Sequence, residues 1–294
     1  MSRGLDHVAH AVRDLDALIA LYRRLGFTVG ARNRHAPEWG TQNHIVQLPG
    51  FFVELLALAD VSTIAPHAAQ FFSFGAFNRD FLARGEGLSL LVVEGSDSES
   101  EARGFRNAGI GDFAIYRFAR EAKRPDGTPT QVAFSLAYAR DDTAPDVGFF
   151  SCRQTYPENF WNPAFQQHAN GVTGIAGVVL VADQPDDHRG FFAAFIGTAE
   201  IASHAGGITI ATPRGDIQVL TRSAFTEAFG VASPDLTRGA RLAALLFAVR
   251  NQARMHKILQ DAPIDFSERD GRFVVGAQAG MGATIIFQST AAQD

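Results

Sequence analysis

A short unit with the order strand, helix and three further strands is repeated four times along this chain of 294 residues. The first copy opens with the alternating segment 5–12, and the later copies open at 87–93, 173–181 and 242–249. A polar break and a helical pattern follow each opening strand. A unit of this size cannot bury its apolar face alone, so the copies must pack against one another. The repeat therefore predicts an α+β fold built from four βαβββ modules.

Hydrophobic periodicity places the elements within each copy. In the first copy, Asp14 is expected to cap a helix that ends at Gly26, and Pro49-Gly50 joins two strands into a hairpin. The aromatic segment 61–83 is expected to be helical and to bridge the first two copies. The other predicted strands are 27–33, 43–48, 51–58, 87–94, 113–120, 131–138, 147–154, 207–211, 216–221, 271–277 and 283–288, and the other predicted helices are 98–107, 191–196 and 253–259.

Composition limits the classes of partner. A net charge of -5 argues against nucleic acid as a ligand, because binding to phosphates requires clustered Lys and Arg. No apolar run approaches the ~20 residues that cross a bilayer, and the sequence begins with a strand pattern instead of an apolar leader. The single cysteine, Cys152, excludes an internal disulfide. We therefore expect a cytoplasmic protein with a small-molecule substrate or ligand, and no nucleic-acid or membrane partner.

Two segments carry a resemblance to a known family. The opening LDHVAHAVRDLDALIALYRRLGF and the apolar strand FFVELLAL, with its single Glu, resemble the vicinal oxygen chelate superfamily. The pair WGTQN with VELL, and the bridge PENFW…HANG, are similar to its glyoxalase-like branch. The resemblance implies that modules pair into two half-open β-barrel domains. These would span 1–155 and 172–294, joined by a bridge at 156–171. Four modules in one chain make a homodimer possible but not required.

Strand alternation tests which residues share a face. If His7 faces the concave side, His10 faces the helices. A two-residue turn at Pro49-Gly50 places Ile45 opposite Glu54 and Gln47 opposite Phe52, and opposite residues lie on one face. The residues expected on this face are Asn43, Ile45, Gln47, Phe52 and Glu54, and His44 points the other way. A bulge in the turn would exchange His44 for Asn43.

The family places a divalent metal on the concave face, with ligands from the first and last strand of each module. Carried over, this predicts His7 and Glu54 as ligands and Gln154 as a weak third ligand. Imidazole and carboxylate together suit Zn²⁺, Ni²⁺, Mn²⁺ or Fe²⁺. Glu54 is also the candidate catalytic base. Asn43, Gln47, Phe52 and Trp161 are the candidate substrate-binding residues, with Trp161 reaching the pocket from the bridge.

The later copies lack a full ligand set. Leu88 takes the place of His7 in the second copy, whose last strand offers Ser151, Cys152 and Gln154. The third copy offers Gly174, Ala176 or Gly177 with Gln218, and the fourth offers Ala244 with Gln288. Extradiol dioxygenases of the superfamily carry their iron ligands in the second half of the chain, so that activity is disfavoured here. Metal chemistry is expected in the N-terminal domain alone.

Two functions remain open, beside a third class, a structural scaffold whose cavity is too small for any ligand. The first is a glyoxalase-like, metal-assisted lyase or isomerase that acts on a small oxygen-containing molecule. The second is a metal-free binding protein of the drug-sequestering type. Cys152 is expected to be a buried, inert thiol. Histidines outside the first strand and the hairpin are expected on the surface or in the bridge, namely His35, His67, His168, His188, His204 and His256.

Overall fold

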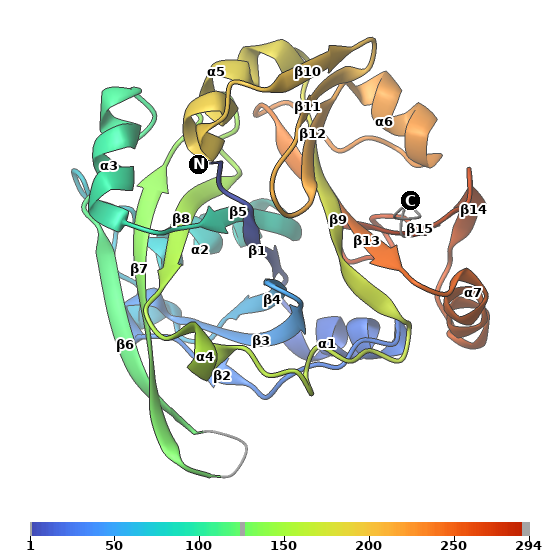
Figure 1. Ribbon diagram of the computed structural model, residues 1–294, viewed down its shortest axis with the longest axis horizontal. Coiled ribbons are helices and arrows are strands. Elements are labelled where there is room, and N and C mark those ends of the chain that lie inside the picture. The colour runs from blue at the N-terminus through green and yellow to red at the C-terminus, as the bar shows by residue number, and fades with distance from the viewer. Residues whose placement is uncertain (1, 124–126, 290–294) are drawn as a thin grey trace.

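The computed structural model describes residues 2–123 and 127–289, which form two eight-stranded mixed sheets (Figure 1). The first sheet has the strand order β2-β3-β4-β1-β5-β8-β7-β6. The order of the second, β10-β11-β12-β9-β13-β16-β15-β14, is that of the first with each number raised by eight. In both sheets the opening strands of two modules pair antiparallel at the centre, and each pairs in parallel with the last strand of its own module. This arrangement confirms the α+β fold of paired βαβββ modules.

The elements follow the predicted order. The first sheet contains β1 (Leu5–Ala11), β2 (Asn33–Arg34), β3 (Thr41–Leu48), β4 (Phe51–Leu58), β5 (Gly87–Glu94), β6 (Tyr116–Lys123), β7 (Pro129–Ala139) and β8 (Gly148–Gln154). The second contains β9 (Val172–Val181), β10 (Ile201–His204), β11 (Gly207–Ile210), β12 (Asp216–Leu220), β13 (Arg241–Val249), β14 (Ser267–Arg269), β15 (Arg272–Val275) and β16 (Thr284–Ser289). The α-helices are α1 (Leu15–Arg24), α2 (Phe74–Arg84), α3 (Ser98–Asn107), α4 (Pro157–Phe160), α5 (Arg189–Phe192), α6 (Arg222–Phe229) and α7 (Gln252–Asp261).

Apolar side chains on the helix-facing sides of both sheets form one cluster. Val8 on β1 and Leu91 on β5 belong to it together with Val178 on β9 and Leu245 on β13. The two sheets therefore share a core. Helix α1 lies on this side, and the Asp14 side chain accepts a hydrogen bond from Ala17 at its start, as the sequence predicts.

Two helices lie on the concave faces instead. Phe74, Phe77 and Phe81 of α2 pack on the concave side of the first sheet, and Phe225 and Phe229 of α6 do the same in the second. The sequence places a helix between the first two modules but not between the last two. The predicted helix 61–83 begins only at Phe74, where Ser73 caps it through Ala76. The predicted strand 27–33 is confined to Asn33–Arg34.

Bulges in the central strands fix the correspondence between modules. The pairing of β1 with β5 skips Asp6 on one strand and Ser89 on the other. The pairing of β13 with β9 skips Ala243 and Ala176 in the same way. Counting from these bulges, the counterparts of His7 are Leu90, Gly177 and Ala244. The match of His7 to Leu88 was therefore wrong by two residues, because the sequence pattern does not reveal the extra residue of a bulge.

In the part of the chain that the structure describes, no helix has the length and hydropathy that a membrane span requires.

Candidate active site and metal site

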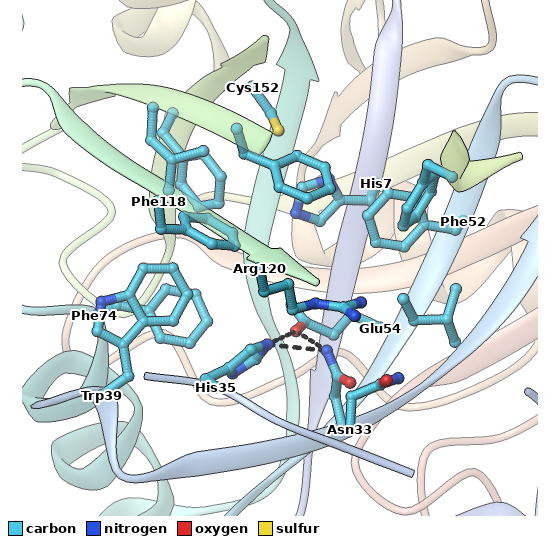
Figure 2. Close-up of a pocket in the computed structure, with 16 residues that line it drawn as sticks. His7, Asn33, His35, Trp39, Phe52, Glu54, Phe74, Phe118, Arg120 and Cys152 are labelled. Atoms are coloured by element: carbon cyan, nitrogen blue, oxygen red, sulfur yellow. Dashed lines mark hydrogen bonds and ion pairs between the residues drawn. The ribbon is translucent and has the colours of Figure 1, made fainter. Parts of the chain in front are cut away.

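A small pocket opens on the concave face of the first sheet, and Phe74 of α2 forms part of its wall (Figure 2). Its volume is about 70 Å³. Most of its wall is apolar and aromatic, which lowers the local dielectric around the few polar groups. The lining consists of Trp39, Ile45, Phe52, Phe74, Phe118, Phe134, Leu136, Phe150 and Phe160, together with His7, Asn33, His35, Asn43, Glu54, Arg120 and Cys152.

The strand register brings His7 and Glu54 to this pocket from neighbouring strands. Phe52 lies beside His7 and Glu54 lies beside Ala9 in the parallel pair β1–β4. Ile45 lies opposite Glu54 in the hairpin, as the two-residue turn predicts. His44 points to the other side, where its Nδ1 atom bonds the carbonyl of Gly30 at 2.7 Å. The expected orientation of both strands is thus observed.

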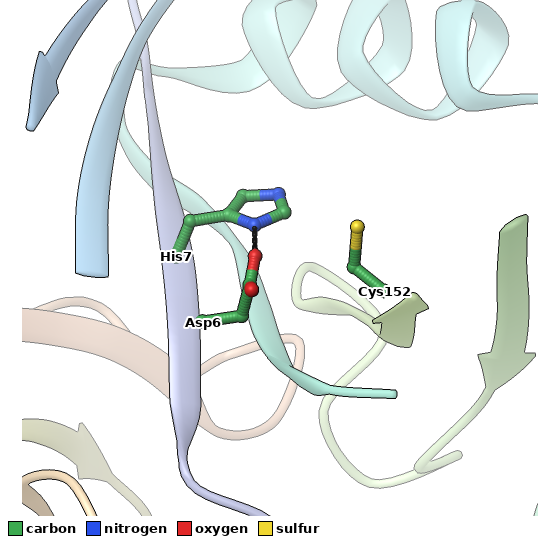
Figure 3. A group of neighbouring side chains, drawn as sticks. All are labelled: Asp6, His7 and Cys152. Carbon is green, nitrogen blue, oxygen red and sulfur yellow. Dashed lines mark hydrogen bonds and ion pairs between the residues drawn. The ribbon is translucent and has the colours of Figure 1, made fainter. Parts of the chain in front are cut away.

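His7 is held by a carboxylate that the sequence analysis did not single out. Its Nδ1 atom lies 2.5 Å from Oδ1 of Asp6, and both side chains are buried (Figure 3). A carboxylate accepts hydrogen bonds, so the Nδ1 proton points to Asp6 and Nε2 is the ring nitrogen left to bind a ligand. The imidazole also stacks on Phe52 at 4.2 Å between ring centroids. These contacts fix the ring in one orientation.

Cys152 completes a group of potential metal ligands. One ligand atom from each of Asp6, His7 and Cys152 lies within 4.8 Å of the other two (Figure 3). Burial raises the pKa of the Cys152 thiol, and the nearby carboxylates of Asp6 and Glu54 raise it further. The thiol is therefore buried, as expected, but it lies beside the predicted ligand His7.

Gln154 contacts Asp6, the residue that holds His7. Its Nε2 atom donates to Oδ2 of Asp6 at 3.1 Å, so it contacts His7 only through that carboxylate. Its Oε1 atom is buried and has no hydrogen-bond partner in the described part of the chain. Gln154 does not line the pocket. The three predicted ligands therefore divide into two that face the pocket and one that supports Asp6.

Glu54 belongs to a second polar group. Nδ2 of Asn43 donates to Oε1 of Glu54 at 2.6 Å, and Nε2 of His35 lies 3.2 Å from the same oxygen. Burial by itself raises the pKa of Glu54. The hydrogen bond and charge of His35, the charge of His7 and the hydrogen bond from Asn43 outweigh burial, so the pKa falls below its usual value. Glu54 is therefore a buried anion.

The bridge closes one side of the pocket, and Gln47 anchors it. The Gln47 side chain donates to the carbonyl of Phe160 at 2.9 Å and accepts from the amide of Asn162 at 3.0 Å. Both ends of its amide are therefore occupied by the bridge. Trp161 packs against Phe52 at 6.1 Å, behind the lining residue Phe160. Asn43 and Phe52 line the pocket, whereas Gln47 and Trp161 do not.

Sequence reasoning missed four polar residues that line or support the pocket, namely Asn33, His35, Asp6 and Arg120. His35 was expected on the surface, but its Nδ1 lies 2.7 Å from Thr41 and its Nε2 faces Glu54. The pairing of the edge strand β2 could have indicated this position, because Asn33 lies opposite Asn43 and His35 follows Asn33 by two residues. Asp6 escaped notice because alternation alone sends it to the face opposite His7. Arg120 lies on a strand whose predicted bounds were shifted by three residues.

The ligand atoms of Asp6, His7 and Cys152 lie close enough together to fit a divalent metal ion, and Glu54 lines the same pocket outside this group. His7 presents a free Nε2 atom while a carboxylate holds Nδ1, which is the usual arrangement of a metal-bound histidine. Glu54 is anionic, and Cys152 adds a potential sulfur ligand. Two buried acceptors, Oδ1 of Asn43 and Oε1 of Gln154, lack partners among the described residues. Nitrogen, oxygen and sulfur donors together suit Zn²⁺ and Fe²⁺.

In the described part of the second sheet, the concave face also carries a pocket, lined by Gln218, Leu220 and Leu246 among others, but the matching ligand positions differ. The positions that match His7 and Glu54 there are held by Gly177 with Gln218 and by Ala244 with Ile286. Ile286 takes the place in which the sequence analysis offered Gln288. Phe225 and Phe229 of helix α6 pack on this concave face. No imidazole or carboxylate therefore stands at these positions, in agreement with the expectation from sequence.

Comparisons with known proteins agree with this architecture. The sequence profile described as "Glyoxalase-like domain" matches residues 5–196. A hypothetical protein from Staphylococcus aureus has a similar structure, with a TM-score of 0.67 at 10% identity over 98% of this chain and 100% of that one. A mutant of 4-hydroxymandelate synthase from Streptomyces coelicolor superposes with a TM-score of 0.55 at 10% identity, over 100% of this chain and 94% of that one.

A fusion protein of a xylose isomerase-like TIM barrel and 4-hydroxyphenylpyruvate dioxygenase has a TM-score of 0.50 at 13% identity, over 100% of this chain and 50% of the fusion. At these identities the likeness extends to the fold alone. No curated protein sequence matches the chain. The repeated modules, their pairing and the family match together show that the chain belongs to the glyoxalase-like domain family of the vicinal oxygen chelate superfamily.

Proposed function

We propose that the chain is a metal-assisted lyase or isomerase acting on a small oxygen-bearing organic molecule in the pocket of the first sheet. The observation that carries this proposal is the placement of His7 and Glu54 on one concave face, around one buried pocket. Burying a carboxylate costs several kcal/mol unless its partners compensate the desolvation, so the buried Glu54 with its partners supports a functional role for the cavity. A reducing cytoplasm suits such a site, since Cys152 stays a thiol there.

In this proposal His7 and Glu54 are the principal metal ligands, and the predicted third, Gln154, acts through Asp6 instead of as a direct ligand. Asp6 holds the His7 ring by its Nδ1 atom, so Nε2 is the atom that would bind an ion, and the Gln154 amide donates to Asp6. Cys152 is close enough to His7 to act as an additional ligand. A bound divalent ion would supply Lewis-acid polarisation of a substrate oxygen.

The remaining chemistry belongs to Glu54 and its neighbours. Both Asn43 and His35 contact Oε1, which leaves Oε2 free of bonds to the described residues and available to accept a substrate proton. The aromatic wall excludes water and strengthens each polar contact with the substrate. Asn43 also offers its unpartnered Oδ1 to a substrate hydroxyl.

The test is metal stoichiometry in protein prepared without a tag or chelator and reconstituted in turn with Zn²⁺, Ni²⁺, Mn²⁺ and Fe²⁺. We expect close to one ion per wild-type chain and less than about a tenth of that in His7→Ala. Glu54→Gln should weaken binding by about tenfold or more, whereas His204→Ala, in the second sheet, should change nothing. A wild-type chain that retains no ion, or a His7→Ala chain that retains a full one, would overturn the metal proposal.

Aromatic side chains favour the second candidate, a metal-free protein that sequesters apolar molecules. Six of the lining residues are phenylalanines, and they surround the polar groups on several sides. Such a protein would bind apolar probes equally well with or without divalent ions. It would also tolerate His7→Phe, which keeps a ring stacked on Phe52.

A further inference from the structure

Arg120 brings a positive charge into an otherwise aromatic wall. It lies on β6 two residues after Phe118, so strand alternation turns both side chains to one face. Phe134 lies opposite Phe118 on β7, and Arg120, Phe118 and Phe134 all line the pocket. Figure 2 shows the Arg120 side chain among the residues that surround Glu54.

This guanidinium has no partner within 2–123 and 127–289, unlike those of Arg117 and Arg106. Arg117, on the same strand, pairs with Glu99, and Arg106 pairs with Asp112 at 2.5 Å. The acid of the pocket, Glu54, is already engaged by His35 and Asn43. The Arg120 side chain is exposed at the pocket mouth, yet desolvation still lowers its pKa. A guanidinium remains charged under these conditions, so its donors await an acceptor.

The geometry of the donors selects the acceptor. Arginine binds a carboxylate through two parallel hydrogen bonds, and such charged pairs are about twice as strong as neutral ones. The cavity of about 70 Å³ is about half the size of a ~150 Å³ cavity that holds benzene. It therefore favours a compact group over a bulky one. We propose that Arg120 binds the carboxylate of the substrate, which is a small organic acid whose remaining atoms lie against the aromatic wall.

The inference rests on the proposed function only for the place where the substrate binds, since an anion can occupy this position without a metal. The pocket also supplies its own reporter. Both tryptophans of the chain are close to it, because Trp39 lines the wall and Trp161 packs on Phe52. Occupancy should therefore change the intrinsic fluorescence of the protein.

The experiment titrates chelator-treated full-length protein with butyrate, with its uncharged analogue butyramide and with inorganic phosphate. We expect saturable butyrate binding that is tighter than butyramide binding by at least about tenfold. Arg120→Gln should reduce this preference to less than about threefold, and Arg120→Lys, which keeps the charge but loses the fork, should be intermediate. Arg117→Gln is the matched control on the same strand and should keep the full preference.

Each other outcome decides against the inference. An equal affinity of wild-type protein for butyrate and butyramide, or no binding of either, means that Arg120 is a solvated surface residue. A preference that survives Arg120→Gln places the anion elsewhere, and tighter binding of phosphate rejects a carboxylate. Because the titration is done without metal, a failed metal proposal leaves these results intact, and a failed carboxylate inference leaves the metal stoichiometry intact.

Discussion

The Nδ1 atom of His7 lies 2.5 Å from the Asp6 carboxylate, although neighbouring residues of a strand normally point to opposite faces. The explanation is the bulge in β1, where Asp6 has no partner on β5 while Leu5 and His7 keep theirs. An extra residue in one strand redirects its side chain. The bulge therefore supplies His7 with an orienting carboxylate from the preceding residue in the chain.

Replacing that carboxylate should weaken metal binding without removing a direct ligand. Asp6→Asn keeps the size of the side chain but removes its charge, so the His7 ring is held less firmly and becomes less basic. We expect an affinity for Zn²⁺ about 10–100-fold lower than in the wild-type protein, measured by competition with a chelating dye. Asp142→Asn, at an exposed ion pair with Arg140, serves as the control. Unchanged affinity in Asp6→Asn would mean that the orientation of His7 does not depend on Asp6.

The contact between His35 and Glu54 should stabilise the fold. His35→Phe preserves ring packing against Trp39 and Phe74 but leaves the buried carboxylate with one partner fewer. The free energy of unfolding should fall by about 1–3 kcal/mol, measured by urea denaturation at pH 7. In a Glu54→Gln background the same change should cost clearly less. Equal losses in the two backgrounds would show that the ion pair contributes nothing.

Gln47 should control the closure of the pocket by the bridge. Gln47→Ala removes the hydrogen bonds to Phe160 and Asn162 and should destabilise the protein by about 1–2 kcal/mol. Trp161 should also become more exposed, seen as a red shift and faster acrylamide quenching of its fluorescence in a Trp39→Phe background. Gln42→Ala, on the same strand, is the control. A bridge held by aromatic packing alone would leave the spectrum of Gln47→Ala unchanged.

Acid should destabilise the protein through His10, which lies on the helix-facing side of β1, opposite the pocket. Burial lowers the pKa of His10 to about 4, against a smaller opposing effect of its bond to the Met281 carbonyl. Between pH 6.5 and 4 the unfolded chain therefore binds a proton that the folded chain refuses, and stability falls as the pH falls. This single group accounts for a loss of about 3 kcal/mol at pH 4 relative to pH 7. His10→Gln should show a correspondingly shallower dependence in urea denaturation, and parallel curves would contradict this origin.

The repetition of the module made most of the fold predictable from the sequence. Each module alone gives ambiguous patterns, but four aligned copies fix the order of strands and helices, and helix 98–107 agrees with α3 to the residue. The short edge strand at Asn33–Arg34 and helix α6 were harder to predict. The first has too few residues for a periodic signal, and the second depends on Phe225 and Phe229 finding an empty concave face.

The site was predictable only where alternation holds. His7, Asn43, Phe52 and Glu54 lie on the predicted face because the hairpin register is regular. Asp6 was not predictable, because its orientation comes from a bulge. His35 and Arg120 reach the pocket from an edge and from a long hairpin, whose positions depend on tertiary packing and not on local pattern.

The central claim is that His7 and Glu54 hold one metal ion in the N-terminal pocket. The most direct test is a crystal structure of the Zn²⁺-loaded protein with anomalous scattering at the zinc edge. The account predicts one anomalous peak, about 2.0–2.1 Å from Nε2 of His7 and about 2.0–2.2 Å from an oxygen of Glu54. A peak that avoids His7, or a pocket without a peak in fully loaded crystals, would contradict it.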